Sequence, residues 1–128
     1  MYFSNLNYKP HERIRAVAGG NQIVPTGNFD RGISTIDNYL TNGRPITVGV
    51  HHTFNAGYNE GTTDHYIVLV GRGITNGQVY YRFYDVATRH RNLGTSPLNR
   101  LYLNGNSATG NTQYSNRRTY TLSQVRPN

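Results

Sequence analysis

The stretch DHYIVLVGRGITNGQVYYRFYD, residues 64–85, contains two strand patterns separated by the dipeptide Asn76-Gly77. Asn-Gly is the strongest short signal for a β-hairpin, because a type I′ turn needs positive φ at both central residues. Both flanking runs are rich in Val, Ile, Tyr and Phe, which favour strands. We therefore predict an antiparallel hairpin whose first strand begins near His65 and whose second strand ends near Asp85.

The register of this hairpin decides whether its histidine and its aspartate can meet. In a regular two-residue hairpin His65 and Asp85 fall on opposite faces of the sheet. One bulge in the first strand pairs Ile67 with Asp85, which then lies diagonal to His65 on the same face. Gly71 and Gly73, which lie in the first strand between His65 and the turn, favour a bulge there. A contact between the histidine and the aspartate therefore requires one irregularity in the ladder.

A histidine that contacts a carboxylate has a known chemical use. The carboxylate fixes the imidazole tautomer and stabilises the imidazolium that forms when the ring takes a proton from a nucleophile. The alternative is structural: Asp64-His65 begins a strand and Asp85 ends one, each as a cap. The spacing alone leaves both interpretations open.

The rest of the chain predicts a single domain over residues 1–128, with an irregular segment at 1–32 and a sheet-rich core at 33–128. Apolar residues at helical spacing predict one amphipathic helix between Asp30 and Gly43, capped by Asp30 or Ser34. Pro45 ends the helical pattern, and a strand follows over 46–50. The remaining expectations are a short helix over 11–18, loops over 53–63 and 104–116, and a last strand over 119–125.

Composition limits the function classes. The chain has 128 residues, no cysteine, and no apolar run long enough to span a membrane. The N-terminus lacks a signal-peptide pattern, so we expect a soluble domain, secreted or delivered only as part of a longer protein, and leave its compartment open. The formal net charge is +7. The arginines are scattered and no nucleic-acid-binding motif accompanies them, so a nucleic-acid partner is disfavoured.

The runs over 36–40, 43–50, 64–71 and 81–85 resemble the C-terminal half of papain-like cysteine peptidases of the bacteriocin-processing (C39-like) type. The resemblance covers residues 33–88 approximately. The order of the expected elements predicts an α+β fold, a curled antiparallel sheet of four to six strands with one or two helices packed at one side, and the resemblance implies a papain-like fold of this kind. The resemblance also implies that His65 is the general base and Asp85 its orienting partner, in the hydrolysis of a peptide or peptidoglycan amide.

The chain departs from that family because it has no cysteine nucleophile. Three explanations remain: the chain is part of a longer protein, it is a pseudoenzyme that binds without catalysis, or a hydroxyl replaces the thiol. The last is the least favoured, because a hydroxyl is a poor nucleophile at neutral pH. The hydroxyl candidates ahead of the His65 strand are Ser4, Ser34 and Thr35.

We expect three further residues to line the substrate-binding side: His51, Asp64 and Tyr66. His51 and His52 with Asp64 or His65 also suit zinc, but adjacent histidines on a strand point to opposite faces, so we predict no metal and no cofactor.

Two function classes follow. The first is a cysteine-peptidase-type domain that keeps its His-Asp pair. The second is an inactive binding or inhibitory module with a peptide, peptidoglycan or protein partner; Tyr80, Arg82 and Tyr84 share one strand face and offer a surface for a peptide or glycan.

Overall fold

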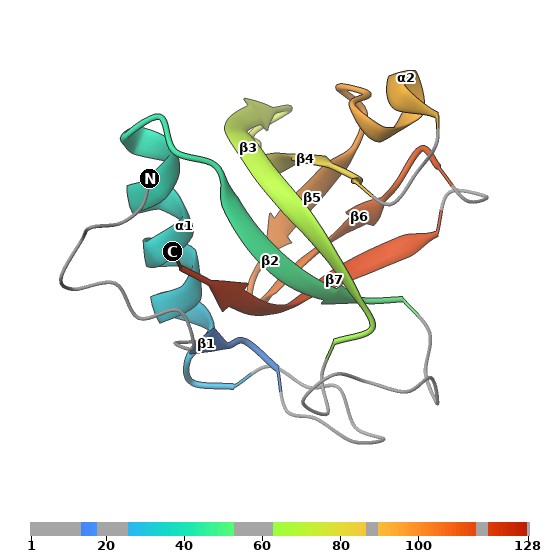
Figure 1. Ribbon diagram of the computed structural model, residues 1–128. Coiled ribbons are helices and arrows are strands. Elements are labelled where there is room, and N and C mark those ends of the chain that lie inside the picture. The colour runs from blue at the N-terminus through green and yellow to red at the C-terminus, as the bar shows by residue number, and fades with distance from the viewer. Residues whose placement is uncertain (1–13, 18–25, 53–62, 87–89, 115–117, 128) are drawn as a thin grey trace, which may run out of the picture.

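The computed structural model describes residues 14–17, 26–52, 63–86, 90–114 and 118–127. Within these ranges seven strands form one antiparallel sheet (Figure 1). The strands are β1 (Ile14–Arg15), β2 (Ile46–His51), β3 (His65–Thr75), β4 (Gln78–Tyr84), β5 (Arg100–Asn104), β6 (Ser107–Asn111) and β7 (Thr119–Arg126).

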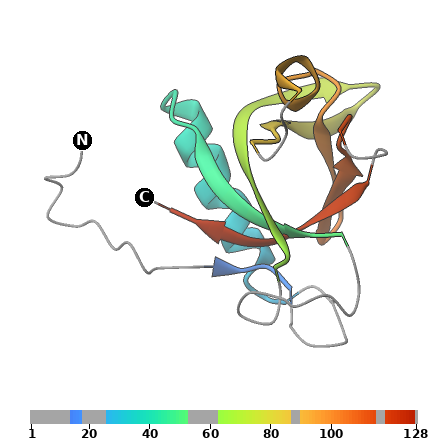
Figure 2. The same cartoon turned by 45° about the vertical axis from the view of Figure 1, so that its right-hand side comes forward.

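Six of these strands close into a barrel. The sheet order is β1-β7-β2-β3-β4-β5-β6, and β6 also pairs with β7. Figure 2 shows the ribbons of β2 to β7 curling round until the first and last meet. The expected papain-like α+β fold, an open curled sheet with helices packed at one side, is therefore wrong. The antiparallel pairing was predicted correctly; the closure was not.

The barrel interior is the hydrophobic core. Alternate residues of each strand point inward, as the two-residue period of a strand requires. In β3 only Ile67 and Leu69 are fully buried, whereas Val68 and Val70 keep part of their surface exposed. The apolar run over residues 66–70 is typical of a strand buried on both faces, but a barrel strand has one interior and one exterior face. The core also contains Ile46, Val48, Val50, Tyr81, Phe83, Leu101, Tyr120, Leu122 and Val125.

The predicted helix is present as α1 (Phe29–Thr41) and packs against β1, β2, β3 and β7. It begins after Asn28 rather than at Asp30 or Ser34, because Phe29 adds one more apolar contact at its start. Figure 1 shows it beside the barrel, near the start of β2 and the end of β7. A second, four-residue helix, α2 (Arg91–Gly94), lies between β4 and β5.

The central hairpin has the predicted turn and the predicted irregularity. Asn76 and Gly77 have φ of 50° and 77°, as a type I′ turn requires. The β3–β4 register shifts between Leu69 and Gly71, so Val70 is the extra residue, immediately before the first of the two expected glycines. His65 and Asp85 consequently lie on the same face, the interior of the barrel.

Two expectations outside the hairpin are wrong. Residues 14–15, expected to be helical, form β1 because they pair with Gln124 and Val125 of β7. Residues 107–111, expected to be part of a loop, form β6 because they pair with β5 on one side and β7 on the other. Residues 53–62 of the expected loop over 53–63 lie outside the described part of the chain.

Candidate functional site

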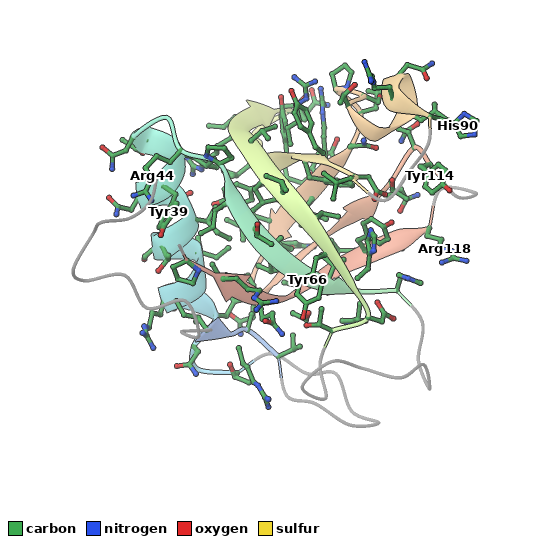
Figure 3. All side chains as sticks on the ribbon, in the orientation of Figure 1. Tyr39, Arg44, Tyr66, His90, Tyr114 and Arg118 are labelled. Atoms are coloured by element: carbon green, nitrogen blue, oxygen red, sulfur yellow. The ribbon has the colours of Figure 1, made fainter. Side chains whose placement is uncertain are left out.

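One end of the barrel gathers the polar side chains of the candidate site. The strands β2, β4 and β6 end there, and β3 and β7 begin there. This brings together His52, His65, Asp85, Thr112 and Tyr120, which come from distant parts of the sequence. Figure 3 shows neighbouring Arg118 at the side of the molecule away from α1.

The His65–Asp85 pair is the centre of this site. The distance between His65 Nε2 and Asp85 Oδ1 is 2.9 Å. The Asp85 side chain is completely buried, whereas His65 keeps 20% of its side-chain surface exposed. The other carboxylate oxygen, Oδ2, accepts hydrogen bonds of 2.8 Å from the hydroxyls of Thr112 and Tyr120. A fixed, buried carboxylate thus contacts a histidine that remains accessible.

These contacts decide the charge of the carboxylate and the tautomer of the ring. Burial raises the pKa of Asp85, but the hydrogen bonds from His65, Thr112 and Tyr120 lower it by more, so the pKa of Asp85 lies below its usual value. An ionised carboxylate can only accept hydrogen bonds, so His65 Nε2 carries the proton that it donates to Asp85. The lone pair of the neutral ring is therefore on Nδ1, directed away from Asp85.

Tyr120 holds the pair in place from the side. Its ring centroid is 5.2 Å from that of His65 and 5.7 Å from that of Phe83. Burial, followed by the hydrogen bond to Asp85, raises the pKa of Tyr120 well above the usual value. Tyr120 therefore stays protonated and remains a hydrogen-bond donor to the carboxylate.

A second imidazole, that of His52, lies across from His65. The two ring centroids are 6.2 Å apart, and His52 also packs against Tyr120 at 5.7 Å. The backbone N–H of His52 donates to both carboxylate oxygens of Asp64, at 3.1 and 3.2 Å. Arg118 Nη1 lies 3.5 Å from His52 Nε2 and adds a positive charge to this side.

The histidines at the end of β2 make stability depend on pH. Burial is the largest effect on both, and the pKa values of His51 and His52 lie below 6.5. The unfolded chain therefore binds protons at a higher pH than the folded protein does. This contribution to stability is complete above pH 6.5 and declines as the pH falls from 6.5 toward the folded pKa values.

We expect a lower free energy of unfolding at pH 5.5 than at pH 7.5, measured with urea. A His52→Gln variant is expected to show a smaller difference between the two pH values. His90→Gln, which removes an exposed histidine, is the control and should keep the full difference. If the unfolding free energies of His52→Gln at pH 5.5 and pH 7.5 differed as much as those of the native protein, the His52 imidazole would not set the pH dependence.

The three residues expected to bind substrate occupy different places. Asp64 reaches the site, but its carboxylate accepts the backbone N–H of His52, which matches the capping role left open by the sequence. His51 pairs with Thr121, and alternation along β2 places it on the exterior face, opposite His52. Tyr66 also lies on the exterior, where the Arg126 guanidinium is 5.0 Å from its ring centroid. His52, rather than His51, is therefore next to His65.

Two of the three hydroxyl candidates, Ser34 and Thr35, do not supply a nucleophile to His65. Ser34 and Thr35 belong to α1, which packs at the other end of the barrel, and the Thr35 hydroxyl donates to the Arg31 carbonyl. Ser4 lies outside the described residues. In the part of the chain that the structure describes, no group of three or more His, Cys, Asp or Glu side chains could hold a metal ion.

Thr112 and Tyr120 are functional neighbours that sequence reasoning missed. Tyr120 could have been found, because it alternates with Leu122 along the last predicted strand and so belongs to the interior face. Thr112 had no such signal, since it follows a strand that was expected to be a loop. Its position depends on the pairing of β6 with β7.

No helix among the described residues is both long and apolar enough to cross a membrane. No protein-family model, curated protein or solved structure matches the chain.

Proposed function

We propose that the protein acts in the hydrolysis of amide bonds in peptides or peptidoglycan, with His65 as the general base and Asp85 as its orienting partner. The observation that carries the proposal is the 2.9 Å contact between an accessible imidazole and a fully buried carboxylate. Thr112 and Tyr120 support it, because they hold the carboxylate in one orientation and keep it ionised.

The nucleophile in this proposal is a thiol from a polypeptide segment other than these 128 residues, which contain no cysteine. His65 Nδ1 takes the proton of that thiol, and the thiolate attacks the carbonyl carbon of the amide. His65 then returns the proton to the leaving nitrogen, and a water molecule, activated by the same ring, releases the acid. Asp85 stays ionised throughout and stabilises the imidazolium.

His52 and Arg118 have a role in the same proposal. The His52 ring centroid is 6.2 Å from that of His65, and Arg118 adds positive charge beside His52. Negative charge that develops on a substrate carbonyl oxygen at this place would be stabilised by the positive charge of Arg118.

The alternative is a binding or inhibitory module without catalysis. The packing of His65 against Tyr120 favours it, because a ring held in a network of buried polar groups also has a structural use. This alternative predicts that His65 can be replaced with no effect on any amide hydrolysis.

The test uses the gene product as the source cells make it, assayed on a mixture of fluorescence-quenched peptides and on purified peptidoglycan. We expect amide hydrolysis that iodoacetamide abolishes, and a rate about 10²–10⁴ times lower in His65→Ala. His90→Ala, which removes an exposed histidine from the start of α2, is the matched control and should keep the native rate. The absence of hydrolysis by the native product would favour the binding alternative.

A further inference from the structure

The exterior face of β4 and β5 carries a cluster of tyrosines and arginines. Their interior neighbours, Tyr81, Phe83 and Leu101, fill the barrel, so alternation places this cluster outside. In sheet order β4 and β5 are neighbours and lie between β3 and β6. The cluster consists of Tyr80, Arg82, Tyr84, Arg100 and Tyr102.

Arg100 is held rigidly within this cluster. Its guanidinium carbon is 4.2 Å from the ring centroid of Tyr80, and its Nε donates a 2.9 Å hydrogen bond to the Pro97 carbonyl. Tyr80 is itself fixed, because its ring lies where a side chain at Gly73 would be: a Cβ there would be 2.5 Å from the ring. A fixed guanidinium loses little conformational entropy when it binds an anion.

Arg100 is also one of the residues that line a groove of about 520 Å³. Backbone forms its floor at Gly110, where β6 comes so close to β5 that no side chain fits. Besides Arg100, the groove is lined by the Tyr102 side chain and by two residues with side-chain amides, Asn111 and Gln113. The lining residues are Leu98, Arg100, Tyr102, Gly110, Asn111 and Gln113.

Charge favours an anionic occupant of this groove. The sequences of β4, β5 and β6 contain no aspartate or glutamate. Among the described residues, the acidic side chains lie on α1 or at the His65 end of the barrel, and they are Asp30, Asp37, Asp64 and Asp85. Arg100 therefore lines the groove without an acidic side chain from its own or the neighbouring strands to neutralise its charge.

The geometry discriminates between classes of anion. A peptide cannot add to β5 or β6 as a further strand, because β5 pairs with β4 and β6, and β6 pairs with β5 and β7. Single-stranded nucleic acid binds through a run of cations and open aromatic faces. Here a single arginine lines the groove, and the Tyr80 ring is occupied by Arg100 and β3.

We propose that this groove binds a glycan that carries carboxylates, through one acidic sugar. The Arg100 guanidinium holds the sugar carboxylate with two parallel hydrogen bonds. The Tyr102 ring packs on the apolar face of the sugar, and the Asn111 and Gln113 amides bind its hydroxyls. This proposal is independent of the chemistry assigned to His65.

The test is calorimetric titration of the protein with tetragalacturonate, an uronic-acid oligomer. We expect binding that weakens at least 10-fold in Arg100→Gln and in Tyr102→Ala. Arg44→Gln is the matched control, because Arg44 stacks 4.4 Å over the Tyr39 ring on α1 and its loss removes the same charge elsewhere. Circular dichroism of each variant confirms that it is folded.

The methyl-esterified oligomer, which has the same sugars without the charge, is expected not to bind. Three results would overturn the proposal: no binding of tetragalacturonate at millimolar concentration, equal weakening by Arg100→Gln and Arg44→Gln, or tighter binding of a tetraglutamate peptide or a short oligothymidylate than of tetragalacturonate.

Discussion

An Asp85→Ala variant is expected to lose about 3–5 kcal/mol of unfolding free energy, because it removes a buried carboxylate that accepts three hydrogen bonds, and each buried donor left without an acceptor costs about 1–3 kcal/mol. The deletion leaves the hydroxyls of Thr112 and Tyr120 and the His65 Nε2–H without their acceptor. The Tyr120 and Thr112 contacts are buried, so water cannot replace the carboxylate at low cost. Urea denaturation at pH 7 measures the loss.

The same variant is expected to change the response to acid. The pKa of Asp85 is lower in the folded protein than its usual 3.8, so its contribution to stability is complete above pH 3.8 and is lost as the pH falls through the folded pKa. The unfolding free energy of Asp85→Ala should therefore not show the decrease that protonation of Asp85 causes in the native protein at low pH. Asp30→Ala, on the exposed face of α1, is the control and should cost well under 1 kcal/mol. Equal losses in the two variants would contradict the proposed network.

A Gly110→Ala variant is expected to destabilise the barrel by about 3 kcal/mol or more, as severe overpacking does. The added Cβ would lie 1.6 Å from the Arg100 carbonyl oxygen and 2.8 Å from its carbon. Both are backbone atoms, so the clash is relieved only if β5 and β6 move apart. Since β6 also pairs with β7, we expect the closure of the barrel to weaken first.

Urea denaturation and hydrogen exchange of the β6 and β7 amides measure this effect. Gly71→Ala is the matched control, because Gly71 is also a strand residue but a Cβ there would meet nothing within 4 Å. Its unfolding free energy should stay within about 0.5 kcal/mol of the native value. If Gly110→Ala were as stable as Gly71→Ala, the close approach of β5 and β6 would be wrong.

The predictions that succeeded rest on local rules. The Asn76-Gly77 turn fixed the hairpin, and the requirement that His65 and Asp85 share a face led to the bulge, which occurs at Val70. The helix followed from apolar spacing and a glycine, Gly43, just beyond its end. Each of these signals lies within a short stretch of chain, where backbone sterics and side-chain periodicity decide the conformation.

The closure of the barrel was not predictable in this way. In β6 the buried apolar side chain is that of Ala108, and the other residues are Ser, Thr, Gly and Asn, which are typical of loops. This strand exists because β5 and β7 supply partners on both sides. The expectation of an open, papain-like sheet failed for this reason, and so did the identification of Thr112, which reaches Asp85 only because β6 is in place.

The choice between His51 and His52 shows how a small error in strand length changes a predicted site. The sequence placed the end of the strand at Val50, whereas β2 continues through His51 and leads directly into His52. Alternation from Val50, which is fully buried, then directs His52 to the interior, beside His65. A boundary shift of one or two residues is within the usual uncertainty of strand ends.

The central claim is that His65 is a general base, and the rate of amide hydrolysis by the natural gene product tests it most directly. The measurement is the ratio of the native rate to that of a folded His65→Ala variant, on the same quenched peptides and peptidoglycan. We predict a ratio of about 10²–10⁴. A ratio near one, or a native product without hydrolysis, would contradict the claim and assign the His65–Asp85 pair to stability instead.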